Sequence, residues 1–179
     1  DDIDAKADAF IDFLAERVVG REFSHEITGM TFTVRSFSEL EDFFRSLQRN
    51  FPRKVCFWSG YNNDLAHLIE AGSDMFLMPS MYEPCGLNQM YSLKYGTVPI
   101  VRKTGGLADT VQLWNPSTRA GTGIVFDHYD AQGVSWAIHT GLDLFKDKDS
   151  WGQLVRNGMA QDFSWPKEAA LYEKMYREL

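Results

Sequence analysis

Short apolar runs alternate with segments of helical periodicity along the middle of the chain, from Gly60 to Phe126. The runs expected to be buried strands are Met75 to Met78, Val98 to Val101 and Ile124 to Phe126. Short strands separated by about 10 to 15 residues of helical period form parallel neighbours joined by crossover helices. The alternation therefore predicts an α/β fold, a Rossmann-like doubly wound parallel sheet with helices on both faces.

The same periodicity predicts the other elements. Expected helices run from Lys6 to Gly20, Phe37 to Leu47, Asn62 to Ala71, from after Pro84 to Tyr95, and from Gly105 onward. Two further strands are expected at Met30 to Val34 and Val55 to Trp58. After Asp130 the chain is predicted to be a helical C-terminal tail. A chain of 179 residues is long enough for one core, so residues 1–179 are predicted to form a single domain.

Ligands of doubly wound sheets bind beyond the carboxyl ends of the strands. The loops that start at Gly60, Pro79 and Arg102 each follow an expected strand. We therefore expect these three loops to line one crevice.

Composition excludes several classes of function. A net charge of -7 disfavours nucleic acid or an anionic membrane as partner, and no apolar run reaches the ~20 residues that cross a bilayer. The chain has only two cysteines, Cys56 and Cys85, and neither belongs to a close CxxC pair, so this low count suggests a reducing compartment. The four histidines lack metal-binding spacing, and neither a P-loop nor a GxSxG elbow is present. We expect no metal and no other cofactor.

The segment from Pro79 to Leu87 carries the strongest candidate for chemistry, the carboxylate of Glu83. Pro84 suits a first helical turn, and Gly86 lets the backbone approach a ligand closely. Free amides at such a helix start would bind phosphate or sugar oxygens. By spacing alone, an acid that merely interacts with the helix dipole is equally consistent with the pattern.

Three other features each allow two interpretations. Gly105 and Gly106 with Lys103 form either a simple tight turn or an anion site. Tyr61 either packs or stacks on a base. Lys6 is either a phosphate contact or a solvated helix residue.

Several long motifs, taken in order, resemble the bacterial glycogen synthase and plant starch synthase family. They are Ala71 to Ser80, Glu83 to Tyr91, Tyr95 to Val101, Thr104 to Val111 and Gly158 to Trp165. The resemblance covers the chain from about Gly60 onward.

This resemblance implies the carboxyl-terminal domain of a GT-B glycosyltransferase, which binds the nucleotide sugar. The implied reaction transfers glucose with retention from ADP-glucose, or UDP-glucose in relatives, to the non-reducing 4-hydroxyl of an α-1,4-glucan. An amino-terminal domain, expected to lie outside this chain, would supply the α-glucan acceptor site, so the chain alone is expected to be inactive. The implied compartment is the cytoplasm of a bacterium, or the plastid if the source is a plant.

The resemblance also implies roles for individual residues. Glu83 would lie beside the donor sugar and stabilise the positive charge that builds as the glycosidic bond breaks. Cys85 and Gly86 would offer backbone amides to the glucose. Gly86, Leu87 and Asn88 would contact the diphosphate.

Two more residues receive roles from the family, Tyr61 as the aromatic that stacks on adenine and Lys6 as the lysine at the leaving phosphate. The sequence departs from the family at Met81 and Leu68, where arginine is usual, and at Ala7, where glycine is usual. Two alternatives stay open: a divergent GT-B module that is a non-catalytic scaffold, and a glucan synthase with another acceptor.

Overall fold

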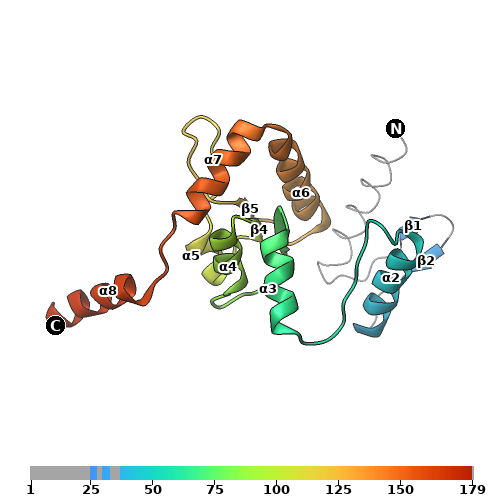
Figure 1. Cartoon of the computed structure of the whole chain (residues 1–179), viewed down its shortest axis with the longest axis horizontal. Helices are drawn as coiled ribbons and strands as arrows, with labels where there is room; N and C mark the ends of the chain where they lie inside the picture. The colour runs from blue at the N-terminus through green and yellow to red at the C-terminus, as the bar shows by residue number, and fades with distance from the viewer. Residues whose placement is uncertain (1–24, 28–29, 33–36, 179) are drawn as a thin grey trace.

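The computed structural model of the chain describes residues 25–27, 30–32 and 37–178 (Figure 1). The helix expected from Lys6 to Gly20 lies outside these residues, as does Lys6 itself.

A three-stranded parallel sheet forms the centre of the fold. It consists of β3 (Met75–Met78), β4 (Val98–Arg102) and β5 (Ile124–Phe126) in the order β3-β4-β5. Leu77 pairs with Ile100, which in turn pairs with Ile124. The three strands predicted from their short apolar runs are confirmed.

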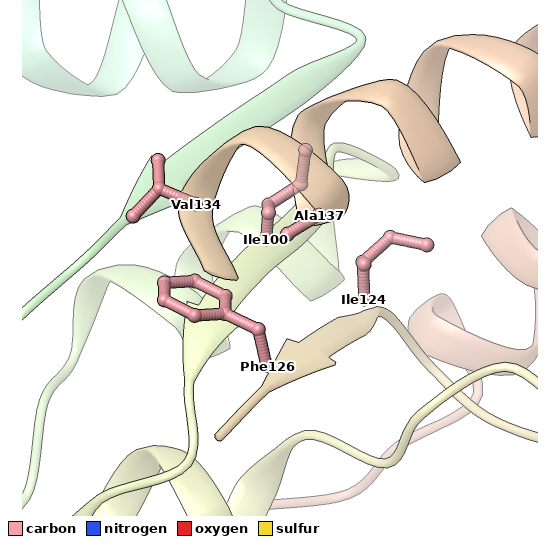
Figure 2. Close-up of a cluster of buried hydrophobic side chains, with 5 residues drawn as sticks. All are labelled: Ile100, Ile124, Phe126, Val134 and Ala137. Carbon is pink, nitrogen blue, oxygen red and sulfur yellow. The ribbon is translucent and has the colours of Figure 1, made fainter. Parts of the chain in front are cut away.

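Helices cover both faces of this sheet, as the alternation predicted. On one face Ile100, Ile124 and Phe126 pack against Val134 and Ala137 of α6 (Ala131–Lys146), as Figure 2 shows. Beside this cluster, α7 (Lys148–Met159) packs Trp151 and Leu154 against Val98 and Trp114. Side chains alternate along a strand, so Met78 and Val101 point to the other face. There they contact Leu107 of α5 (Gly105–Thr110) and Val111.

Two helices precede strands of the sheet and contact each other, α3 (Asn63–Gly72) and α4 (Asn88–Tyr95). The side chain of Asn62 caps α3 by accepting a hydrogen bond from the Leu65 amide at 3.0 Å. The last helix, α8 (Trp165–Arg177), extends away from the sheet (Figure 1). The tail after Asp130 is thus helical, as predicted. No helix in the described ranges is long and apolar enough to cross a membrane.

The region before α3 differs from the prediction. Met30 belongs to β2 (Met30–Phe32), which pairs antiparallel with β1 (His25–Ile27) in a separate two-stranded sheet. The segment from Val55 to Trp58 is not a strand. Its Phe57 ring stacks on Phe44 of α2 (Phe37–Asn50), with ring centroids 5.4 Å apart.

The physical reason is that Phe57 of this segment makes its hydrogen bond and its ring contact with the nearby helix α2 and not with a neighbouring strand. The Phe57 amide donates to the side-chain oxygen of Gln48 on α2 at 2.9 Å. An apolar run of four residues is equally compatible with a strand and with packing on a helix.

Candidate functional site

The β3–α4 loop, residues 79–87, follows the carboxyl end of β3 as predicted, but α4 begins at Asn88 and not after Pro84. Gly86 has φ +72°, which is incompatible with a helix, so the loop continues through Leu87. Pro84 therefore does not occupy a first helical turn. The backbone from Pro84 to Leu87 thus lies outside the helix.

The backbone N–H groups of Cys85, Gly86 and Leu87 make no hydrogen bond within the described part of the chain. Cys85 and Leu87 are exposed, and Gly86 is half-buried. Three consecutive amide donors without a partner among the described residues, next to the positive end of α4, can donate to anionic or hydroxyl oxygens.

Glu83 precedes these amides and is half-buried. Its carboxylate has no hydrogen bond or ion pair to any residue that the structure describes, so both oxygens are available to accept from a ligand hydroxyl. The backbone of Glu83, in contrast, is held: its carbonyl oxygen accepts from the Gly106 amide at 3.1 Å.

Gly105 and Gly106 bring the start of α5 into backbone contact with the β3–α4 loop. A Cβ atom on Gly105 would lie 1.9 Å from the Glu83 carbonyl oxygen, and one on Gly106 would lie 2.0 Å from that of Cys85. Since the Gly106 amide binds protein, it does not serve an anion. The close contact of both glycines with the β3–α4 loop shows more than a plain turn, and the anion site at Gly105 and Lys103 stays a prediction.

A buried glutamine, Gln89, supports the loop from α4. Its Nε2 donates to the carbonyl oxygens of Cys85 at 3.1 Å and Gly86 at 2.9 Å, and to Thr110 Oγ1 at 3.1 Å. Thr110 Oγ1 donates in turn to the Gly106 carbonyl at 2.6 Å. We did not identify Gln89 or Thr110 from the sequence. The available signal was an amide side chain three and four residues after the loop carbonyls that it binds.

Arg102, at the end of β4, holds the beginning of the same loop. Its Nη1 donates to the Met81 carbonyl at 2.6 Å, and its guanidinium carbon lies 5.1 Å from the centre of the Tyr129 ring. Lys103 pairs with Asp127 at 3.6 Å, and both side chains are largely exposed, so this ion pair contributes little to stability. The loops after β3, β4 and β5 thus meet at one edge of the sheet.

Two predicted residues remain, Tyr61 and Asn88. Tyr61 is 94% exposed and makes no ring contact with a described residue. The segment before it, Val55 to Trp58, is not a strand, so the sheet does not position Tyr61 and the Gly60 loop does not follow a strand as expected. The loops at Pro79 and Arg102 do contact each other at the carboxyl edge of the sheet, and that they line a crevice stays a prediction. Asn88 is exposed as the first residue of α4.

His67 and Glu70 lie where α3 meets α4. His67 Nδ1 is 3.2 Å from the Tyr95 hydroxyl, which agrees with a hydrogen-bonded helix residue rather than a catalyst. Glu70 is 3% exposed, and its Oε2 has no partner among the described residues. Burial raises the pKa of the Glu70 carboxyl above its ordinary value, and the charge of nearby His67 offsets part of the rise.

A hollow of about 340 Å³ lies beside β5 and the start of α6, apart from the β3–α4 loop. Its lining residues are Leu113, Val125, Phe126, Asp127, His128, Asp130, Gln132, Gly133 and Trp136. None of the residues singled out in the sequence as ligand contacts lines it.

The parallel sheet with helices on both faces is the Rossmann-like arrangement found in the domains of GT-B glycosyltransferases. Two solved structures of low sequence identity share this fold. Sucrose-phosphate synthase from Thermosynechococcus elongatus is 23% identical with a TM-score of 0.54 over 80% of this chain and 35% of its own. Anabaena Alr3699/HepE in complex with UDP-glucose is 14% identical with a TM-score of 0.58 over 82% of this chain and 39% of its own.

Residues 38–157 match the family of group 1 glycosyl transferases, and the chain belongs to this family. Among curated relatives, glycogen synthase of Koribacter versatilis is 54% identical over 77% of this chain and 28% of its own length. Glycogen synthase of Bacillus cereus is 43% identical over 91% and 34%. The catalytic domain of starch synthase IV from Arabidopsis thaliana, bound to ADP and acarbose, is 36% identical with a TM-score of 0.66 over 79% of this chain and 30% of its own. The chain therefore spans about a third of the length of these relatives.

Proposed function

We propose that this chain is the donor-binding domain, over residues 1–179, of a retaining glucosyltransferase. The complete enzyme transfers glucose from ADP-glucose, or UDP-glucose, to the non-reducing 4-hydroxyl of an α-1,4-glucan. The observation that carries the proposal is the β3–α4 loop, which places an unpaired carboxylate beside three free amides. The glycogen synthase relatives and the ADP-bound starch synthase support the choice of reaction and of donor.

The two halves of the loop suit the two halves of a nucleotide sugar. During transfer the bond from glucose C1 to the diphosphate breaks and a bond from C1 to the acceptor oxygen forms. The diphosphate leaves with the bonding electron pair, and the proton of the acceptor hydroxyl passes to the departing diphosphate oxygen. The free amides of Cys85, Gly86 and Leu87, with Asn88 at the helix start, would bind the diphosphate and the sugar. The Glu83 carboxylate would bind sugar hydroxyls and favour positive charge at C1.

Two further roles rest on the family resemblance alone. Tyr61 would stack on the base of the nucleotide, for which its exposed ring is available. Lys6 would contact the leaving phosphate. The α-glucan acceptor would bind to a second domain of the complete protein, in the bacterial cytoplasm.

The test compares the complete enzyme with its Glu83→Ala variant in glucan synthesis from ADP-glucose and from UDP-glucose. Loss of one group that stabilises transition-state charge lowers kcat by about 100-fold or more, and we expect at least that loss. Glu173→Ala, at an exposed glutamate of α8, is the matched control and should keep full activity. Calorimetry with ADP and UDP identifies the nucleotide, and binding of neither would contradict the proposal.

A non-catalytic scaffold is the second candidate, favoured by one observation. Met81 and Leu68, at positions where the resembled family has arginine, are both 69% exposed and supply no charge for a ligand. In a scaffold, Glu83→Ala would leave glucan synthesis unchanged. Product analysis of the complete enzyme separates the third alternative, a glucan synthase with another acceptor.

A further inference from the structure

Gln89 is fully buried, with 0% of its surface exposed, directly behind the β3–α4 loop. Its Nε2 contacts the carbonyl oxygens of Cys85 and Gly86. Carbonyl oxygens only accept hydrogen bonds, so the nitrogen of the amide, and not its oxygen, must face them. The side chain thus has one usable orientation.

These two hydrogen bonds also determine where the neighbouring amides point. In a planar trans peptide the C=O of one residue and the N–H of the next point in opposite directions. When Gln89 holds the carbonyls of Cys85 and Gly86 toward the protein, the N–H groups of Gly86 and Leu87 must point away from it. Neither N–H group has a hydrogen-bond partner among the residues that the structure describes. Pro84 lies between Glu83 and Cys85, whose carbonyl oxygens are both hydrogen-bonded, and as a proline it has no N–H that could bind a ligand.

Gly86 and Gln89 are matched in shape. A Cβ atom on Gly86 would lie 2.5 Å from Gln89 Oε1, so the glutamine amide fills the space that a side chain at residue 86 would need. Gln89 Oε1 itself has no hydrogen-bond partner among the described residues. A buried carbonyl oxygen without a partner lowers the stability of the fold. A functional role of the Gln89 side chain would explain why this cost is tolerated.

Thr110 binds the same amide from α5. Its hydroxyl accepts from Gln89 Nε2 at 3.1 Å and donates to the Gly106 carbonyl at 2.6 Å. The amide is therefore clamped between α4 and α5, and α5 is the helix whose Gly106 holds Glu83.

We propose that Gln89, clamped by Thr110, is a positioning residue that aims the backbone N–H groups of Gly86 and Leu87 at the diphosphate of the nucleotide-sugar donor. This inference rests on the proposed function and sharpens it, because it selects Gly86 and Leu87 over Cys85 as the pre-oriented donors. Donors held in place before binding stabilise developing charge without reorganisation.

The experiment uses the complete enzyme with Gln89→Leu, which keeps the volume and removes both N–H donors. We expect the Kd for ADP to rise about tenfold, and kcat/KM for ADP-glucose to fall by about 10- to 100-fold, with KM for a maltooligosaccharide acceptor unchanged. Thr110→Val should raise the Kd for ADP about threefold. The double variant should bind ADP no more weakly than Gln89→Leu alone, since both act through one amide.

Gln161→Leu is the matched control. Gln161 is half-buried and donates to the Asn157 carbonyl at 3.2 Å, far from the loop in sequence. Its loss removes a comparable hydrogen bond and should leave ADP binding unchanged. If Gln89→Leu fails to fold, Gln89→Met, with a more adaptable side chain, makes the same comparison.

The outcomes separate this inference from the proposed function. A folded Gln89 variant that binds ADP as tightly as the parent overturns the positioning role alone. An equal rise in the KM for the donor and the KM for the acceptor would show general loosening of the fold, and would also overturn the positioning role. A parent enzyme that binds neither ADP nor UDP removes both proposals.

Discussion

The amide of Gly106 donates a 3.1 Å hydrogen bond to the carbonyl oxygen of Glu83, and this bond joins the start of α5 to the β3–α4 loop, two segments that follow neighbouring parallel strands. The two main chains approach so closely that a Cβ atom on residue 106 would lie 2.0 Å from the Cys85 carbonyl oxygen, so residue 106 must have no side chain. The hydrogen bond also leaves the Glu83 carboxylate free, because only the backbone of Glu83 is engaged.

Gly106→Ala should therefore damage both stability and donor binding. Its Cβ would lie 2.0 Å from the Cys85 carbonyl oxygen, and the obstacle is backbone that can move only with the whole loop. We expect a loss of about 2 to 3 kcal/mol in the free energy of unfolding. Chemical denaturation measures this loss, and ADP affinity should weaken with it.

Gly72→Ala is the control for this glycine. An added Cβ at Gly72, the last residue of α3, meets nothing within 4 Å. Its effect on stability should stay within about 0.5 kcal/mol. Equal losses for the two variants would contradict the role given to Gly106.

Arg102→Leu should loosen the start of the β3–α4 loop, because it removes the donor to the Met81 carbonyl and the contact with the Tyr129 ring. We expect kcat/KM for the donor to fall about tenfold, with a stability loss of about 1 to 2 kcal/mol. Steady-state kinetics and thermal unfolding measure the two effects. Arg156→Leu, at an arginine on α7, should leave kcat/KM unchanged.

Glu70→Gln should stabilise the protein at neutral pH. Because burial raises the pKa of Glu70, the folded protein binds a proton at Glu70 more readily than the unfolded chain. The stability that comes from proton binding at Glu70 is fully present below the pKa of the unfolded chain and is lost as the pH rises through the higher pKa of the folded protein. At pH 7 the buried carboxylate charge is therefore unfavourable for folding.

The gain from Glu70→Gln should be greatest at pH 7 and should shrink as the pH falls toward the ordinary glutamate value of 4.5. Thermal unfolding of parent and variant between these two pH values measures it. A gain that stays constant with pH would show that the carboxyl charge is not its cause.

Leu154→Ala should destabilise the protein strongly, since Leu154 is completely buried between α7 and β4. A loss of about 2 to 5 kcal/mol is expected for a leucine whose cavity cannot collapse. Leu142→Ala on α6, where the leucine is 38% exposed, should cost less than half as much in the same denaturation experiment.

The periodic part of the fold was predictable because it depends on local pattern. Met75–Met78, Val98–Val101 and Ile124–Phe126 are short apolar runs between helical segments, and the only burial open to them is a sheet covered on both faces. The placement of Glu83 at the end of β3 follows from the same pattern.

Val55 to Trp58 shows where pattern is insufficient. Its four apolar residues suit a strand as well as they suit packing against α2, and the choice depends on Phe44 and Gln48, which lie earlier in the chain. Met30 to Phe32 likewise forms a strand as expected, but its partner is β1 and not the parallel sheet.

The sequence by itself determined the α/β class, the three parallel strands and the position of the Glu83 loop at their carboxyl edge. Only the tertiary structure decided that Gly105 and Gly106 hold that loop, and that Gln89 and Thr110 orient its amides. The physical reason is the distance along the chain over which each feature acts. Periodicity is local and indicates which face of a helix or strand is buried. The hydrogen bond between Gln89 and Thr110 depends instead on how α4 and α5, which belong to separate crossovers, pack together.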